Sequence, residues 1–445
     1  MTDHQRTLSR KDFRDYEFIL KEMERALSMV GPALMAHYNA HQEDAFYTLP
    51  RSDGRGHLPF TRKGESHFYE IVHRGLRAMG SASRRYDISN LVNALKLAFI
   101  AGKEDEPPLT AENAHELFET VIREVEEGLD VLTHYIPCSI VAHSQPDQFE
   151  VGPVKFVWRE RFFRENESVL RTTIDETPGF EWGFEALESF FKQSSWVAMV
   201  TIEAADKEKS SERAREITQT ALDMLKAVIG SARGAGIRQA YDNGMPSRIA
   251  SLNLAAGKGF SPSWGSRSHD AVLTEDWHQV IRTLPFWETA ESILDRYSNA
   301  WEVLDEPYLR FLDALKWHGE AISDSEPNAR SVKYWIAVER LVSFRSNDDV
   351  TKKAASLSCE SPRQFPDHFK KCQRLFGKRS AIVHGSASRE TGESEGVALE
   401  IENLSRTLLF SYLRLIRELE LDGRCDRQGL ATEFESLGVN NRSKQ

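Results

Sequence analysis

The sequence predicts a mostly α-helical protein in three parts: a helical N-terminal region at 1–132, an α/β middle region with a small sheet at 133–273, and a C-terminal helical bundle at 274–445. Two observations predict this division. Apolar residues recur every three or four positions over most of the chain, which is the period of an amphipathic helix. Between Tyr135 and Leu254 several short stretches alternate apolar and polar residues instead, which is the period of a strand.

Composition limits the class of protein. The chain has 445 residues, of which 40% are hydrophobic and 10% aromatic, so it can bury a large core without disulfides or metal. Its four cysteines lie far apart and show no spacing of a zinc site. The N-terminus carries no apolar signal segment, and no apolar run is long enough to cross a membrane. We therefore expect a cytoplasmic protein with reduced cysteines, no metal, no cofactor and no membrane contact.

The N-terminal region is predicted to be all-helical. Apolar periodicity indicates helices at 12–30, 66–79, 88–101 and 110–132. A polar segment rich in glycine, arginine and proline at 50–64 is expected to be a loop.

The middle region is predicted to contain a small sheet. Strands are expected at 136–140, 149–151, 154–158, 196–203 and 248–254, with one helix at 211–229. The glycine-rich segment at 230–236 follows a helix rather than a strand, so it is typical of a helix end and a turn rather than of a nucleotide site. A phosphate-binding loop before Lys258 is also excluded, because Leu252 and Gly259 stand where that motif needs glycine and a hydroxyl residue.

The C-terminal region is predicted to be a bundle of about five helices. Helical periodicity covers 275–283, 286–304, 307–322, 328–345, 367–384 and 397–420. Although the chain carries a net charge of −11, the stretch from Thr351 to Glu390 holds nine lysines and arginines against three acidic residues, a net of +6. Such a segment is either a solvated helix face or a surface for an anionic partner.

An arginine and a histidine separated by four residues occur three times, at 62/67, 363/368 and 379/384. This spacing alone is close to what chance gives, so its surroundings decide. Arg62 is expected in a loop, and Pro366 interrupts the second match, because proline disrupts a helix interior. The third match, Arg379 and His384, lies within one predicted helix and is the informative one.

Arg379 falls where an apolar residue is expected. Phe369, Cys372, Phe376, Arg379 and Val383 step by three and four along one helix face. An arginine in such a row is costly unless it is paired, lies at a subunit interface or faces an anionic ligand. Glu339, on the apolar face of the helix expected at 328–345, is a possible partner. A purely structural Glu339–Arg379 ion pair is therefore one interpretation.

His384 precedes Gly385, a glycine suited to the left-handed turn that ends a helix. The helix dipole favours a protonated imidazole at that end, and such a group can act as acid or base near neutral pH. An arginine bound to a scissile phosphate, with a histidine that moves a proton to or from the ribose oxygen, can cleave RNA without metal. Residues five apart lie about 140° apart around a helix, so one substrate can meet both only if the helix end distorts or two subunits contribute.

The segments Trp335–Leu341 and Arg379–Gly385 together resemble the Apea-like branch of the HEPN superfamily, over roughly residues 300–425. The resemblance implies a compact helical bundle that pairs as a two-fold dimer and joins two Arg–His motifs into one metal-independent ribonuclease site. By position, Arg379 and His384 are implied to be catalytic, with Glu339 and Ser380 supporting. Catalytic members of the wider superfamily often have Asn, Asp or His after the arginine, whereas the Apea-like branch commonly has Ser, as here.

The resemblance implies an endoribonuclease that acts as a homodimer in a bacterial defence or toxin system. In this interpretation, residues 1–273 form a sensor or regulatory region that binds a trigger or an inhibitor. Four cations of the basic stretch are expected to contact RNA: Lys371, Arg374, Lys378 and Arg389. The alternative is a non-catalytic HEPN dimerisation or adaptor protein, in which Arg379 is buried against Glu339 and His384 only ends the helix.

Overall fold

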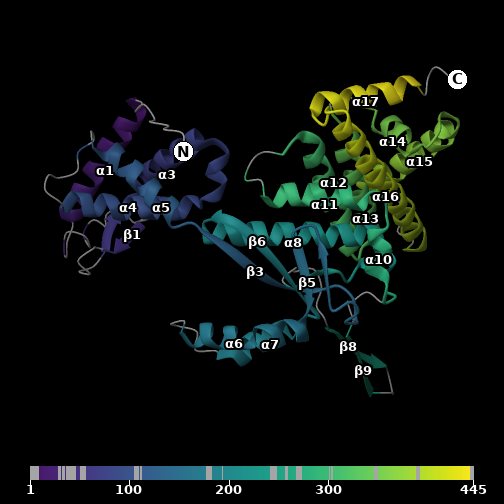
Figure 1. The fold of residues 1–445 in the computed structure, drawn as a ribbon, viewed down its shortest axis with the longest axis horizontal. Helices are drawn as coiled ribbons and strands as arrows, with labels where there is room; N and C mark the ends of the chain where they lie inside the picture. The colour runs from purple at the N-terminus through teal and green to yellow at the C-terminus, as the bar shows by residue number, and fades with distance from the viewer. Residues whose placement is uncertain are drawn as a thin grey trace. The chain divides into compact units, whose positions relative to one another are not determined.

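The computed structural model describes residues 10–28, 32, 36, 47–50, 57–104, 110, 113–176, 183–192, 194–240, 248–255, 259–266, 273–299, 301, 304–344, 349–386 and 391–440. Within them the protein is mostly helical, with a small five-stranded sheet in the middle region, so the predicted fold class is confirmed (Figure 1). The chain divides into two compact units. The first comprises residues 1–132 and 202–212, and the second comprises residues 133–201 and 213–445.

The first unit is built on amphipathic helices: α1 (Arg10–Ser28), α3 (Arg62–Met79), α4 (Ile88–Glu104) and α5 (Ala114–Glu127), with a 3-10 turn η1 (Gly80–Arg85). The side chain of Thr61 begins α3 by accepting the backbone N–H of Gly64. Phe68, Phe99 and Phe118 are buried together in the core of this unit.

Two expectations for this region are wrong. Strands β1 (Tyr47–Pro50) and β2 (His57–Phe60) form an antiparallel hairpin, so the region is not all-helical. Each strand contains a proline, which hid the pattern. The helix expected to reach residue 132 ends at Glu127, where the backbone N–H of Gly128 bonds back to Glu124. Residues from Asp130 onward belong to a strand. The sequence did not show this boundary, because the apolar residues Leu129 and Leu132 fit the period of a helix and of a strand equally well.

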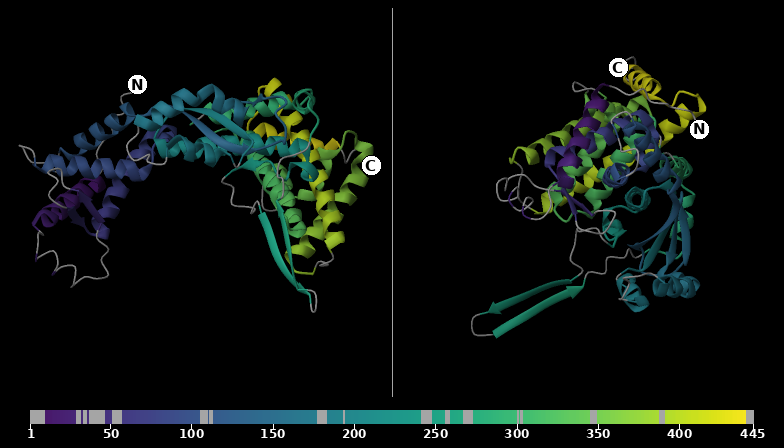
Figure 2. Two further views of the ribbon diagram at one scale, coloured as in Figure 1. Left: turned by 90° about the horizontal axis from the view of Figure 1, so that it is seen from below. Right: turned by 90° about the vertical axis from the view of Figure 1, so that its left-hand side faces the viewer.

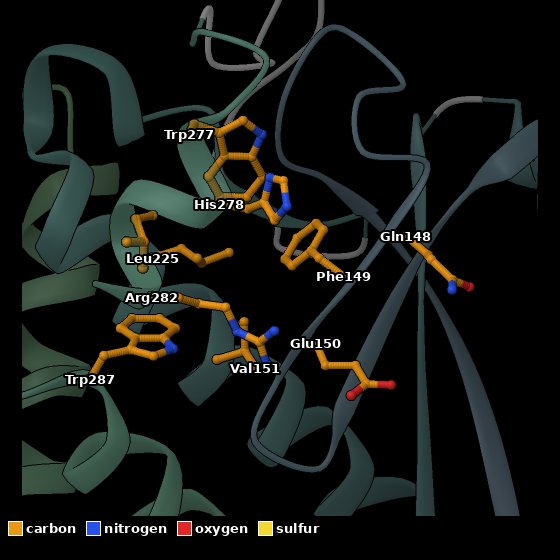
Figure 3. Close-up of a pocket in the computed structure, with 10 residues that line it drawn as sticks. Gln148, Phe149, Glu150, Val151, Leu225, Trp277, His278, Arg282 and Trp287 are labelled. Carbon is orange, nitrogen blue, oxygen red and sulfur yellow. The ribbon is translucent and has the colours of Figure 1, made fainter. Parts of the chain in front are cut away.

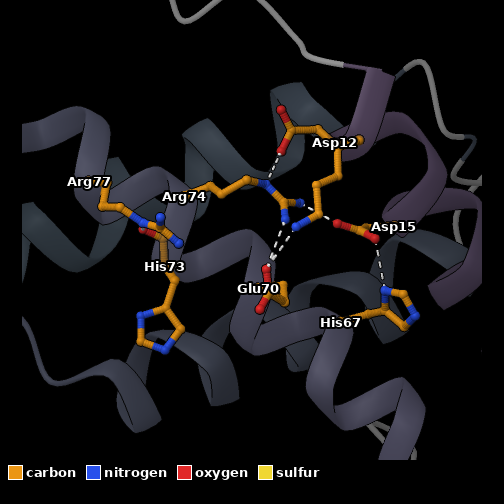
Figure 4. Close-up of polar contacts among 8 residues, drawn as sticks. Asp12, Asp15, His67, Glu70, His73, Arg74 and Arg77 are labelled. Carbon is orange, nitrogen blue, oxygen red and sulfur yellow. Dashed lines mark hydrogen bonds and ion pairs between the residues drawn. The ribbon is translucent and has the colours of Figure 1, made fainter.

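Figure 4 shows an ionic cluster that ties α1 to α3. Arg74 Nε lies 2.7 Å from Asp12 Oδ1, and the Arg74 guanidinium also pairs with the Asp15 carboxylate. His67 Nδ1 lies 2.8 Å from Asp15 Oδ1. Arg62 is the first residue of α3 rather than part of a loop, which corrects the expectation for it. In the Arg–His match at 62/67, the histidine therefore pairs with Asp15 inside the fold.

The sheet of the second unit has the order β4-β5-β6-β3-β7. Its strands are β3 (Asp130–Ser139), β4 (Gln148–Val151), β5 (Val154–Trp158), β6 (Trp196–Ala205) and β7 (Arg238–Gln239). Phe156 of β5 pairs with Phe149 of β4 on one side and with Ala198 of β6 on the other. Four of these strands were predicted, whereas the two-residue β7 was not.

Helices α6 (Arg159–Glu176) and α7 (Gly183–Phe191) cover one face of this sheet, where Phe162 and Phe191 pack on Val157 and Val197. Neither helix was predicted. Helix α8 (Lys207–Ile229) lies on the opposite side of the sheet (Figure 1, Figure 2). Strands β8 (Arg248–Ala255), which was predicted, and β9 (Gly259–Ser266), which was not, form a separate hairpin.

Eight α-helices lie in the described part of residues 274–445, more than the five or so expected. They are α10 (Trp277–Arg282), α11 (Trp287–Asn299), α12 (Glu306–Ser323), α13 (Pro327–Val342), α14 (Val350–Ser358), α15 (Phe365–Val383), α16 (Thr391–Leu421) and α17 (Arg427–Asn440), with a 3-10 turn η2 (Pro362–Gln364). Ile401, Leu408 and Ile416 place the long α16 in the core. Across the described residues, no helix is long and apolar enough to span a bilayer.

A buried ionic cluster joins α8 to α12. Asp223 and Lys226 are 2% and 1% exposed, and Lys226 Nζ donates to Asp223 Oδ1 at 3.0 Å and to the Gly319 carbonyl at 3.4 Å. Burial raises the pKa of Asp223 to about 6, while the charge and hydrogen bond of Lys226 oppose that shift. Gly319 lets the two helices approach this closely, because a Cβ there would lie 2.8 Å from Asp223 Cβ.

A second buried contact joins the short helix α9 (Ser231–Gly234) to α16. Glu402 accepts the backbone N–H of Ser231 at 2.7 Å and also binds its hydroxyl. Nearby, His318 of α12 is fully buried and its Nδ1 lies 2.9 Å from Ser405 Oγ. Burial lowers the pKa of His318 to about 3, with the charges of Arg406 and Lys226 acting in the same direction. These polar contacts fasten the middle region to the helical bundle.

Candidate functional site

Helix α15 presents the predicted site. Its first half is anchored by Phe365, Cys372 and Leu375, all of which are buried. Its end has the expected form, since Gly385 adopts φ 72° and its N–H bonds to the Ile382 carbonyl at 3.1 Å. The prediction that Gly385 ends this helix is confirmed.

Arg379 lies beside Glu339 of α13. Its Nη2 is 3.6 Å from Glu339 Oε1, which is within ion-pair range but longer than a good hydrogen bond. The same Oε1 accepts the Trp335 indole N–H at 2.9 Å, so the buried Trp335 orients the carboxylate. Arg379 Nε is buried and makes no hydrogen bond to any described residue. The Arg379 side chain is 23% exposed, and its guanidinium lies near the Glu339 carboxylate while keeping N–H donors that this carboxylate does not bind.

His384 is more exposed than Arg379. Its side chain is exposed, and none of the residues in the described part of the chain makes a hydrogen bond to its imidazole. Its backbone N–H donates to the Ser380 carbonyl at 3.0 Å, and the Ser380 side chain is half-buried. Within one chain, the structure brings Arg379 to Glu339, but the His384 side chain makes no hydrogen bond or ion pair with either of these described residues.

The apolar row on α15 opens to solvent along its length. Cys372 is 1% exposed, whereas Phe376 and Val383 are 41% and 51% exposed. Arg379 lies between these two exposed side chains in the row. The row is therefore buried at Cys372 and exposed at Phe376 and Val383, so Arg379 stands in the part of the row that faces solvent.

Two of the predicted RNA contacts are already paired. Lys378 Nζ lies 2.6 Å from Glu393 Oε1, and Arg374 pairs with Glu400, its Nη1 lying 3.3 Å from Oε1. Both glutamates belong to α16, outside the stretch whose charge was counted along the sequence. All four side chains are between 43% and 50% exposed, so these ion pairs add little to stability.

The remaining predicted contacts differ. Lys371 is exposed and forms no ion pair with a described residue, whereas Arg389 lies outside the described residues. Sequence reasoning missed an open groove of about 540 Å³ between α12 and α13, with Glu339 on its wall. Trp317, Ile336 and Arg340 also line it, so Glu339 faces both Arg379 and a solvent-filled groove.

Comparison with protein-family models, with curated proteins and with solved structures gave no match for this chain. Among the described residues, no three His, Cys, Asp or Glu side chains are grouped as metal ligands would be. What the end of α15 offers chemically is an exposed imidazole and a partly exposed guanidinium. These groups can transfer a proton and bind an anion.

Proposed function

We propose that this protein is a metal-independent HEPN endoribonuclease that acts as a dimer, with Arg379 and His384 as its catalytic residues. The observation that carries the proposal is that neither side chain is sealed in the core: Arg379 is 23% exposed, and His384 is exposed. The guanidinium would bind the scissile phosphate, and the imidazole would move a proton at the ribose or leaving oxygen. Glu339 would hold Arg379 in place, and Ser380 would support the helix end.

The dimer supplies what one chain lacks. Phe376 and Val383 expose apolar surface on either side of Arg379, and such surface favours contact with a second copy of the chain. A two-fold axis close to Arg379 would bring His384 of the partner subunit toward it. The composite site would then contain two arginines and two histidines. Within one undistorted helix, residues 379 and 384 point about 140° apart, so a single subunit would not direct both at the same phosphate.

The direct test incubates purified protein with total RNA in the presence of EDTA. Wild type is expected to cleave, and Arg379→Ala and His384→Ala are each expected to lose about 100-fold or more of that activity. Arg363→Ala is the matched control, because this exposed arginine belongs to the neighbouring Arg–His match and should leave cleavage unchanged. Equal cleavage by all four proteins would refute the assignment.

The dimer has its own test. Phe376→Glu and Val383→Glu place charges on the exposed row without entering the core, so both variants should fold but sediment as monomers. Cleavage should fall with dimer content, and mixing Arg379→Ala with His384→Ala should restore part of it if each composite site draws on both subunits. A wild type that is monomeric with RNA present would contradict the proposal.

The biological setting rests on the resemblance alone. We propose a bacterial defence or toxin system in which residues 1–273 sense a trigger or restrain the nuclease. Phage plating on cells that carry wild type or His384→Ala tests this part separately. Identical plaque counts would remove the defence role and leave the nuclease assignment intact.

The second candidate is a non-catalytic dimerisation or adaptor protein. The ion pairs of Lys378 with Glu393 and of Arg374 with Glu400 favour it, because they turn part of the basic stretch toward α16 rather than toward a substrate. A dimer that Val383→Glu disrupts, together with RNA that wild type leaves intact, would select this candidate.

A further inference from the structure

A second site candidate lies away from α15, in a pocket of about 140 Å³ between strand β4 and helices α8, α10 and α11 (Figure 3). Three aromatic side chains form its walls: Phe149, Trp277 and Trp287. Phe149 and Trp277 meet edge to face, with ring centroids 5.0 Å apart. An engineered apolar cavity of about 150 Å³ holds one benzene molecule, so the pocket has the size of a single aromatic ring.

The pocket has polar atoms that the fold leaves without partners. Trp287 is 3% exposed and Trp277 is 4% exposed, yet neither indole N–H has an acceptor in the structure. His278 Nδ1 is likewise buried without a partner. Figure 3 shows the Trp287 nitrogen on the edge of its ring that faces Arg282 and Val151. Native structures seldom leave buried N–H groups unpaired, so the Trp287 N–H, which faces the pocket, indicates an acceptor supplied from outside the chain.

The charge of the pocket mouth points the same way. Arg282 is exposed, lines the pocket and makes no ion pair with any described residue. In Figure 3 the Glu150 carboxylate points away from the aromatic walls, on the far side of its strand. Indole N–H and guanidinium groups can only donate, so together they select a ligand with a strong acceptor, and the cation selects an anionic one.

We propose that this pocket binds a small planar aromatic acid of benzoate size. The ring lies among Phe149, Trp277 and Trp287, and the carboxylate accepts from Trp287 Nε1 and from the Arg282 guanidinium. Aromatic walls favour a flat ring through edge-to-face and stacked contacts, which a puckered aliphatic ring makes less well. The strand comes from the middle region and α10 and α11 from the C-terminal region, so the ligand contacts both. The proposal is independent of any ribonuclease activity.

The experiment is isothermal titration calorimetry of the full chain with three probes: benzoate, benzamide and cyclohexanecarboxylate. Benzoate should bind with one site per chain and a millimolar or tighter dissociation constant, given the few atoms it contributes. Benzamide lacks the charge and cyclohexanecarboxylate lacks the planar ring, so each should bind at least about tenfold more weakly.

Two variants test the residues. Trp287→Phe keeps the ring but removes the N–H, and Arg282→Gln removes the charge from an exposed side chain, so both should fold and weaken benzoate about tenfold. Arg363→Gln, an exposed arginine on another part of the unit, should bind like wild type. Circular dichroism confirms folding of each variant. No benzoate binding to wild type, unchanged binding by both pocket variants, or equal binding of cyclohexanecarboxylate would overturn the proposal.

Discussion

Two regions of the second unit hold titratable side chains under opposite conditions. In the buried cluster between α8 and α12, Asp223, Lys226 and His318 are at most 2% exposed. At the end of α15, Arg379 is 23% exposed and His384 is exposed. Each region therefore holds a histidine and a cationic side chain, and the two regions differ in the access of these groups to solvent.

This difference in exposure separates the side chains that stabilise the fold from those that can bind a ligand. Burial raises the pKa of Asp223 to about 6 and lowers that of His318 to about 3. In both cases the protein interior disfavours the charged form of the side chain. Most buried charged groups have their partner inside the protein, as Lys226 has Asp223, and removing that partner is costly. An exposed group can exchange its partner for a ligand, as the proposed nuclease requires of Arg379 and His384.

The largest expected effect comes from crowding the buried cluster. Gly319→Ala adds a Cβ that would lie 2.8 Å from Asp223 Cβ, between two helices that cannot part without breaking the Lys226 contacts. We expect a loss of about 3 kcal/mol in the free energy of unfolding, or failure to fold. Urea denaturation followed by circular dichroism measures the change.

Gly377→Ala is the matched control in α15. A Cβ at this exposed helical position meets nothing within 4 Å, so alanine should stabilise the protein by about 0.5–1 kcal/mol through its better helix propensity. The two substitutions are chemically identical and should differ in sign. If Gly319→Ala proved as harmless as Gly377→Ala, the close packing of α8 on α12 would be wrong.

The next effect concerns pH and His318. In the unfolded chain this histidine takes up a proton near its ordinary pKa, whereas in the folded protein burial lowers its pKa to about 3. Between the two values the unfolded state binds more protons, so the stability that neutral His318 contributes is lost as the pH falls. His318→Gln does not titrate. The stability advantage of wild type over this variant should therefore shrink by about 2 kcal/mol from pH about 7.5 to pH about 5.

Comparison with the variant isolates His318, because the opposite titration of Asp223 is present in both proteins. Urea unfolding curves at the two pH values give the four free energies required. If the difference in unfolding free energy between wild type and His318→Gln did not change with pH, water or a counter-charge would have to reach the imidazole. His318 would then be less isolated from solvent than its burial indicates.

The sequence predicted the helical elements best where an apolar face repeats over several turns. Helices α8, α12 and α13 were placed to within a few residues, because each buries one face along most of its length. The hairpin of β1 and β2 was missed because prolines mask four-residue strands. Helix α14 has nine residues, too few for periodicity to identify. Short elements depend on tertiary contacts that a local pattern does not contain.

For the candidate site, the sequence located the helix end and the acid beside Arg379, because both follow from local spacing and an apolar face. It did not reveal that Phe376 and Val383, in the same apolar row as the buried Cys372, are exposed. Nor did it reveal that Glu393 and Glu400 of α16 face Lys378 and Arg374. A charge counted along the chain omits residues that only folding brings close.

The smallest expected effect tests the exposed side of the comparison. A double-mutant cycle of Lys378→Ala and Glu393→Ala should give a coupling energy below about 1 kcal/mol, since both side chains are nearly half exposed and each is solvated when unpaired. The coupling should vanish at about 1 M salt, where the screening length falls to about 3 Å. Unfolding free energies of the four proteins at low and high salt measure it. A salt-resistant coupling of several kcal/mol would show that Lys378 is committed to α16, and it would then favour the adaptor over a nuclease that needs this lysine for RNA.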